Sequence, residues 1–212
     1  MKKNLNPKGD SGVRLGVSEI AQVESDERDW LLDHAAGNRQ AFARLVEAYR
    51  SPVYAYLVRS GVSAADRDDL FQEVFIRVHR SAASYDPERP VAPWLFTIVA
   101  NMVRNHLRSG RVRELIFRHA PNADPADSSE RGDERIEAAE NRAWLEREIR
   151  QLPRAQREAL LLTYLKPMPR PQIAAALGIP LNTLKTNLRR ARLELVRRLS
   201  KRDRPPNGKV KR

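Results

Sequence analysis

Residues 172–192 read QIAAALGIPLNTLKTNLRRAR, and this stretch carries the clearest structural signal in the chain. Ile173 and Leu177 are one helical turn apart and predict a short helix, which Gly178 should end as a usual C-terminal stop. A three-residue turn containing proline follows, and a longer helix should begin at about Asn182. The apolar residues of that helix share one stripe: Leu184, Leu188, Ala191, Leu195 and Leu199. The pattern predicts a helix-turn-helix, a motif whose second helix enters the major groove of DNA.

The first turns of the predicted second helix supply polar and basic side chains off the apolar stripe. Residues at the start of a recognition helix face base edges, and arginines further along reach bases or phosphates. An ordinary helical hairpin with a solvated basic face is the alternative, but the alanine-rich first helix and the glycine turn favour the helix-turn-helix. The candidate DNA-binding residues are Asn182, Thr183, Lys185, Thr186, Arg189 and Arg190.

The charge of the chain is concentrated near its C-terminal end. The 212 residues carry a formal net charge of +12, yet residues 121–140 hold 2 basic and 7 acidic side chains, whereas residues 141–212 hold 19 and 5. Such asymmetry suits a polyanionic partner, because Lys and Arg contacts to phosphates release counterions. A solubilising surface is the alternative, and charge alone does not decide between them.

Composition excludes several classes of protein. The chain has no Cys, which removes disulfides, thiol nucleophiles and Cys-ligated metal centres, and its four His show no metal-binding spacing. We therefore expect no metal and no cofactor. No apolar run approaches the roughly 18 residues of a membrane span, and the N-terminus lacks the apolar segment of a secretory signal. We expect a cytoplasmic protein without membrane insertion.

The rest of the chain shows helical periodicity and no alternating strand pattern, so we expect an all-α fold of two small helical domains joined by a flexible linker. Helix breaks are predicted at Gly37-Asn38 and Ser60-Gly61, and Ser63 is predicted to cap the next helix. The expected divisions are a flexible N-terminal tail at 1–26, a first domain at 27–110, a flexible acidic linker at 111–136, a second domain at 137–199 and a basic tail at 200–212.

Two further blocks in the first domain carry candidate functional residues. Asp69, Gln72 and Glu73 form a polar stripe at i, i+3 and i+4 on one helix, although such a stripe is also typical of a solvated face. In the second block, residues 93–108, Trp94 and Phe96 precede a polar Asn within an apolar run and then several Arg. Aromatic rings beside cations suit single-stranded nucleic acid, since bases stack and phosphates need neutralising. Filling of the core is the alternative for the two aromatic residues.

These three blocks, in this order, resemble a sigma factor of bacterial RNA polymerase of the extracytoplasmic-function (ECF) group. Residues 69–75 resemble the family's segment that docks on the polymerase clamp helices, and residues 93–108 resemble the segment that opens and reads the minus-ten element. Residues 152–162 and the helix-turn-helix resemble the region that reads the minus-thirty-five element. The resemblance covers residues 27–110 and 137–199.

The resemblance implies a protein that is not an enzyme but makes RNA polymerase promoter-specific and assists promoter melting. It implies core polymerase, through its clamp helices and flap, duplex and single-stranded promoter DNA, and an anti-sigma factor as partners. A stand-alone operator-binding regulator is the alternative. A recombinase with a helix-turn-helix would need a nucleophile together with a carboxylate or Arg cluster, and the chain offers no convincing one. The implied polymerase-binding residues are Asp69, Gln72 and Glu73. The implied minus-ten residues are Trp94, Asn101, Arg104, Asn105 and Arg108, and the minus-thirty-five residues are the six named above.

Overall fold

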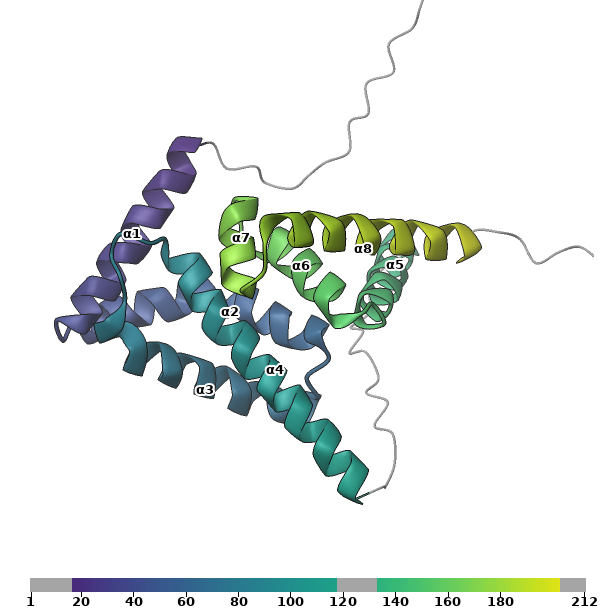
Figure 1. Ribbon diagram of the computed structural model, residues 1–212, viewed down its shortest axis with the longest axis horizontal. Coiled ribbons are helices and arrows are strands. Elements are labelled where there is room, and N and C mark those ends of the chain that lie inside the picture. The colour runs from purple at the N-terminus through teal and green to yellow at the C-terminus, as the bar shows by residue number, and fades with distance from the viewer. Residues whose placement is uncertain (1–16, 118–132, 203–212) are drawn as a thin grey trace, which may run out of the picture.

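The computed structural model describes residues 17–117 and 133–202. Within these two ranges every regular element is helical and there is no strand, so the predicted all-α fold class is confirmed (Figure 1). In the same ranges no helix is both long enough and apolar enough to cross a membrane.

The first range forms four α-helices and a single 3-10 turn: α1 (Val17–Ala35), α2 (Arg39–Ser60), α3 (Ala64–Ser81), η1 (Ala82–Ser84) and α4 (Val91–Phe117). Both predicted breaks are confirmed. Asn38 caps α2, because its Oδ1 accepts the backbone N–H groups of Gln40 and Ala41 at 3.0 and 3.2 Å. Gly61 ends α2 with a φ of 94°, a left-handed conformation that glycine adopts without strain. Ser63 occupies the predicted cap position of α3, but its hydroxyl donates to the Asp66 carboxylate instead of bonding the backbone.

Helices extend beyond the predicted domain limits. The helix α1 begins at Val17, inside the predicted N-terminal tail of 1–26, because the chain holds neither proline nor glycine from there to residue 36. The helix α4 continues through Gly110, since one glycine costs a helix only about 1 kcal/mol. It enters the predicted linker of 111–136, as does the start of α5, and α8 enters the predicted tail of 200–212. The remainder of those segments lies outside the described residues.

The core of the first domain lies where α1, α2, α3 and α4 meet. Its largest fully buried side chains are Tyr49, Tyr56, Phe96, Leu31, Leu45, Leu57 and Leu95. Phe96 lies between two tyrosine rings, with centroid distances of 6.2 Å to Tyr49 and 6.1 Å to Tyr56. The core alternative for Phe96 is therefore confirmed, since its ring has no exposed face to offer a base.

The second range forms the predicted second domain from α5 (Asp133–Arg150), α6 (Arg154–Leu165), α7 (Arg170–Leu177) and α8 (Leu181–Arg202). Its core is made by Leu160, Leu161, Leu162, Ile173, Leu177, Leu184, Leu188 and Ala191. The stripe predicted on α8 is buried only in its first half. Leu199 is 43% exposed, because the end of α8 runs out beyond α6 and α7 (Figure 1).

The two domains pack directly against each other. The first helix of the helix-turn-helix, α7, lies against α4, and α6 lies against α2 (Figure 1). Sequence periodicity gave no indication of this contact between the domains. The contact determines the surroundings of one candidate DNA-binding residue, Arg104.

Candidate nucleic-acid interface

The turn between α7 and α8 sets the direction of the second helix. Gly178 has a φ of 67°, and its backbone N–H reaches the carbonyls of Ala174 and Ala175, which closes the last turn of α7. Leu184 and Leu188 then bury the inner face of α8. The opposite face is open to solvent, and on it lie all six predicted DNA-binding residues: Asn182, Thr183, Lys185, Thr186, Arg189 and Arg190.

A concave surface on this face is lined by four cationic side chains. Arg170 at the start of α7 contributes one of them, and Lys185, Arg189 and Arg192 of α8 contribute the others. Several cations around one hollow raise the local positive potential, and phosphate oxygens are the groups that such a potential attracts. The geometry therefore fits a DNA backbone beside the first turns of α8.

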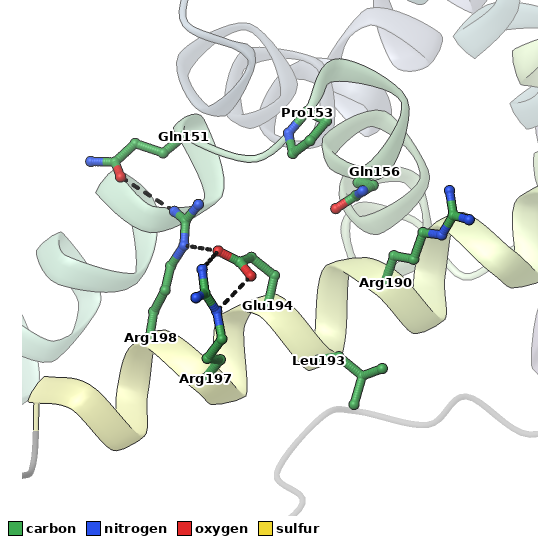
Figure 2. Close-up of a pocket in the computed structure, with 8 residues that line it drawn as sticks. All are labelled: Gln151, Pro153, Gln156, Arg190, Leu193, Glu194, Arg197 and Arg198. Atoms are coloured by element: carbon green, nitrogen blue, oxygen red, sulfur yellow. Dashed lines mark hydrogen bonds and ion pairs between the residues drawn. The ribbon is translucent and has the colours of Figure 1, made fainter.

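The later arginines of α8 are engaged within the domain itself. Figure 2 shows Arg197 and Arg198 converging on Glu194, with shortest N–O separations of 2.7 and 2.8 Å. Arg198 also pairs with Glu148 at 2.8 Å, which ties α8 to α5. Hydrogen bonds from Arg197 and then Arg198 lower the pKa of Glu194 to about 2, so this carboxylate stays ionised and offsets part of the positive charge of α8. Arg190 stands apart from this cluster (Figure 2).

The predicted polymerase-binding residues share the outer face of α3. Asp69, Gln72 and Glu73 are all exposed, while Leu70 and Val74 bury the inner face. An apolar hollow lies beside Gln72, lined by Phe42, Val46, Phe71, Phe75, Ile76 and His79. This combination of exposed acidic groups and adjacent apolar surface is suited to protein contact rather than to DNA.

The predicted minus-ten residues are spread along α4 in different environments. Asn101, Asn105 and Arg108 are exposed. Trp94 is half-buried, and its ring packs edge-on against Tyr85 at a centroid distance of 5.1 Å. Two of them are joined by a hydrogen bond, in which Arg104 Nη1 donates to Asn101 Oδ1 at 3.1 Å.

The structure places Arg104 in an ion pair that the sequence analysis missed. Its Nε donates to Glu158 Oε1 at 3.0 Å and its Nη2 to Glu158 Oε2 at 2.9 Å, a two-pronged contact between α4 and α6. The Glu158 bond raises the pKa of the Arg104 guanidinium further. An ion pair between residues 54 positions apart leaves no periodic signal. The only hint was a carboxylate next to the apolar run that begins at Ala159.

Comparisons with known proteins match both domains. The Sigma-70 region 2 model matches residues 45–113, and the Sigma-70, region 4 model matches residues 142–195. The RNA polymerase sigma factor CnrH of Cupriavidus metallidurans is 32% identical over 180 residues, which cover 81% of this chain and 93% of that relative. The ECF RNA polymerase sigma factor RpoE of Cereibacter sphaeroides is 32% identical over 178 residues, covering 79% of this chain and 93% of the relative.

Solved structures agree with the sequence relatives. A structure of CnrH in complex with the cytosolic domain of CnrY has a TM-score of 0.63 at 26% identity, and the match covers 82% of this chain and 97% of that one. A sigma factor RpoE in complex with the anti-sigma factor NepR, from Bartonella quintana, shares the fold, with a TM-score of 0.59 at 20% identity and a match to 77% of this chain and 98% of that one.

The relatives span both domains, which is inconsistent with a stand-alone regulator that uses only its helix-turn-helix. The exposed faces of α3, α4 and α8 have the arrangement expected for contacts with a protein and with DNA on one chain. This chain belongs to the ECF family of RNA polymerase sigma factors, which direct transcription initiation.

Proposed function

We propose that three helix faces on the two domains have separate roles in initiation: one binds core polymerase and two bind promoter DNA. The α3 face with Asp69, Gln72 and Glu73 docks on the clamp helices of core polymerase. The six exposed residues of α8 read the minus-thirty-five element in the major groove, where each good bidentate base contact contributes about 1–3 kcal/mol of discrimination. The observation that supports this division most directly is that the candidate side chains on α3 and α8 are exposed while apolar residues bury the opposite face of each helix.

The α4 helix serves the minus-ten element in the same proposal. Opening a duplex means unstacking bases, which costs a few kcal/mol per flipped base and must be offset by capture on the protein. The exposed amide of Asn101 and the segment from Tyr85 to Ala92, whose last two residues open α4, are the proposed capture site, and Trp94 packs against Tyr85 of that segment. Arg104 and Arg108 would neutralise the phosphates of the separated strand, and the Asn105 amide would donate a hydrogen bond to that strand.

The partners follow from the same roles. Core polymerase, through its clamp helices and flap, and promoter DNA are the partners that initiation requires. An anti-sigma factor is proposed as a third, supported by the solved complexes of the relatives with CnrY and NepR. We further infer that the chain acts by binding and not as an enzyme, and that it works in the cytoplasm, where RNA polymerase acts.

Reversal of one charge on α3 tests the docking face. Glu73→Lys places a cation where the proposal needs an anion, and Glu140→Lys makes the same change at an exposed position of α5. Core polymerase incubated with each purified full-length chain should retain the Glu140→Lys variant and lose Glu73→Lys, with equal helical content by circular dichroism. Equal retention of both variants would contradict the docking assignment.

A further inference from the structure

The connection between η1 and α4 is folded into a compact turn at residues 86–89. The backbone N–H of Arg89 donates to the carbonyl of Asp86 at 3.0 Å, which closes a β-turn. Pro87 is in the second position of that turn, where the fixed φ of proline is favourable. The Asp86 carboxylate also accepts the backbone N–H of Glu88 at 3.1 Å, so its side chain reinforces the same turn.

Arg89, the last residue of the turn, is held at three points by two residues. Its backbone N–H is bonded to Asp86, its Nε pairs with Asp86 Oδ2 at 3.1 Å, and its carbonyl accepts a hydrogen bond from the Tyr85 hydroxyl. The ion pair is exposed to solvent and contributes little by itself. Tyr85, in contrast, is only 7% exposed, and water competes less for a hydrogen bond made from a buried side chain.

Tyr85 also fastens the turn to the rest of the domain. Its ring packs against the Trp94 ring in the first turn of α4, and its backbone N–H donates to the carbonyl of Ala82 in η1 at 3.1 Å. Burial raises the pKa of its hydroxyl, so this group keeps its proton and remains a donor at neutral pH. One buried tyrosine therefore fixes both ends of a turn whose own residues, 86–89, are all exposed.

We infer that Tyr85 and Asp86 are positioning residues for strand capture, which hold the exposed turn at 86–89 in the conformation that receives an unstacked base of the minus-ten strand. The inference deepens the proposed function and rests on the capture role given there to the segment from Tyr85 to Ala92. A loop that becomes ordered only on binding loses affinity through the conformational freedom that it gives up. A turn that is ordered before the strand arrives avoids most of that loss.

The size of the expected effect follows from the loss of one hydrogen bond. Tyr85→Phe removes only the hydroxyl, and losing one such bond shifts the balance between the ordered and the disordered turn by about two- to tenfold. Because apparent affinity falls with the fraction of competent molecules, capture should weaken by about the same factor. Asp86→Ala should act in the same direction. Asp86→Asn should retain capture, because its amide oxygen can still accept the N–H of Glu88.

The complex of core polymerase with the full chain tests this inference through its binding of a single-stranded minus-ten oligonucleotide, with one abasic site placed at each position in turn. The parent chain should bind the intact strand more tightly than the strand that lacks the captured base. Tyr85→Phe and Asp86→Ala should lower this ratio of affinities by about two- to tenfold. Asp86→Asn should keep it, as should Tyr164→Phe, which removes an exposed hydroxyl from α6.

The ratio separates positioning from a general loss of stability. A purely structural role for Tyr85 and Asp86 would weaken binding to every strand alike and leave the ratio unchanged, and that result would overturn the inference. The two Asp86 variants both remove the charge, so equal ratios for Asp86→Ala and Asp86→Asn would exclude the hydrogen bond to Glu88. If Tyr85→Phe fails to fold, the exposed Asp86 pair of variants decides the matter.

Failure of the proposed function would be seen in the parent chain itself. If no abasic position weakens binding by the parent complex, this segment captures no base, and the positioning roles fall with the capture site. If one position does weaken binding by the parent and weakens it equally in Tyr85→Phe and Asp86→Ala, the capture site stands and only the positioning roles are refuted.

Discussion

Replacing Gly178 should change the free energy of unfolding by an amount whose size and sign follow from one backbone angle. Its φ of 67° is left-handed, and a Cβ built there meets nothing within 4 Å. Gly178→Ala therefore adds no clash, and its cost is the left-handed penalty of an L-residue, about 1–2 kcal/mol. The alanine also reduces the freedom of the unfolded chain, which offsets about 0.4–1 kcal/mol. The net loss should be near 1 kcal/mol in the free energy of unfolding.

Gly110 provides a control with the opposite sign. It lies within α4 without a positive φ, and a Cβ there also meets nothing within 4 Å. Gly110→Ala should stabilise the chain by about 0.5–1 kcal/mol, because alanine is the better helix former. Gly178→Asn should lie between the parent and Gly178→Ala, since Asn tolerates left-handed backbone.

Urea unfolding followed by circular dichroism measures these differences. With a denaturant slope of about 1–3 kcal/mol per molar, a loss of 1 kcal/mol lowers the midpoint by about 0.3–1 M. Gly178→Ala should move the midpoint down and Gly110→Ala should move it up. A Gly178→Ala midpoint at or above that of the parent would refute the backbone argument, as would a Gly178→Asn variant less stable than Gly178→Ala.

Two predictions address the DNA-facing helices. Arg190→Ala should weaken binding to promoters that depend on the minus-thirty-five element by about 1–3 kcal/mol, the value of one good base contact. In the same in vitro transcription assay, promoters with a scrambled upstream element should be unaffected. Equal loss of transcription from both kinds of promoter would show that Arg190 does not recognise bases. Asn101→Ala should reduce the permanganate reactivity of the minus-ten strand, which reports strand opening, and should leave the closed complex intact in a gel-shift assay. Undiminished permanganate reactivity would exclude Asn101 from strand capture.

The features that the sequence could predict are those encoded by neighbouring residues. The Gly178 stop, the break at Gly37-Asn38 and the spacing of Leu184 and Leu188 each act within a turn or two, and all are present in the structure. Helix ends were harder to predict. The helix α1 begins at Val17, ten residues before the buried Glu27, in a stretch that shows no clear apolar periodicity.

The environment of the candidate site residues could be predicted only in part. Exposure of the α3 and α8 faces follows from their periodicity, because polar side chains fall opposite buried apolar ones. The pairing of Arg104 with Glu158 could not be found in this way, since it depends on how two separately encoded domains meet. Leu199 shows the same limit, because the stripe on α8 continues past the surface that could bury it.

The central claim is that this chain gives core RNA polymerase its choice of promoter. The most direct measurement is in vitro transcription with purified core polymerase and a library of genomic promoter fragments, with and without the purified chain. The account predicts discrete start sites that share upstream elements and occur only when polymerase and chain are both present. It would be contradicted if the chain directed polymerase to no start site yet bound duplex DNA tightly and specifically by itself.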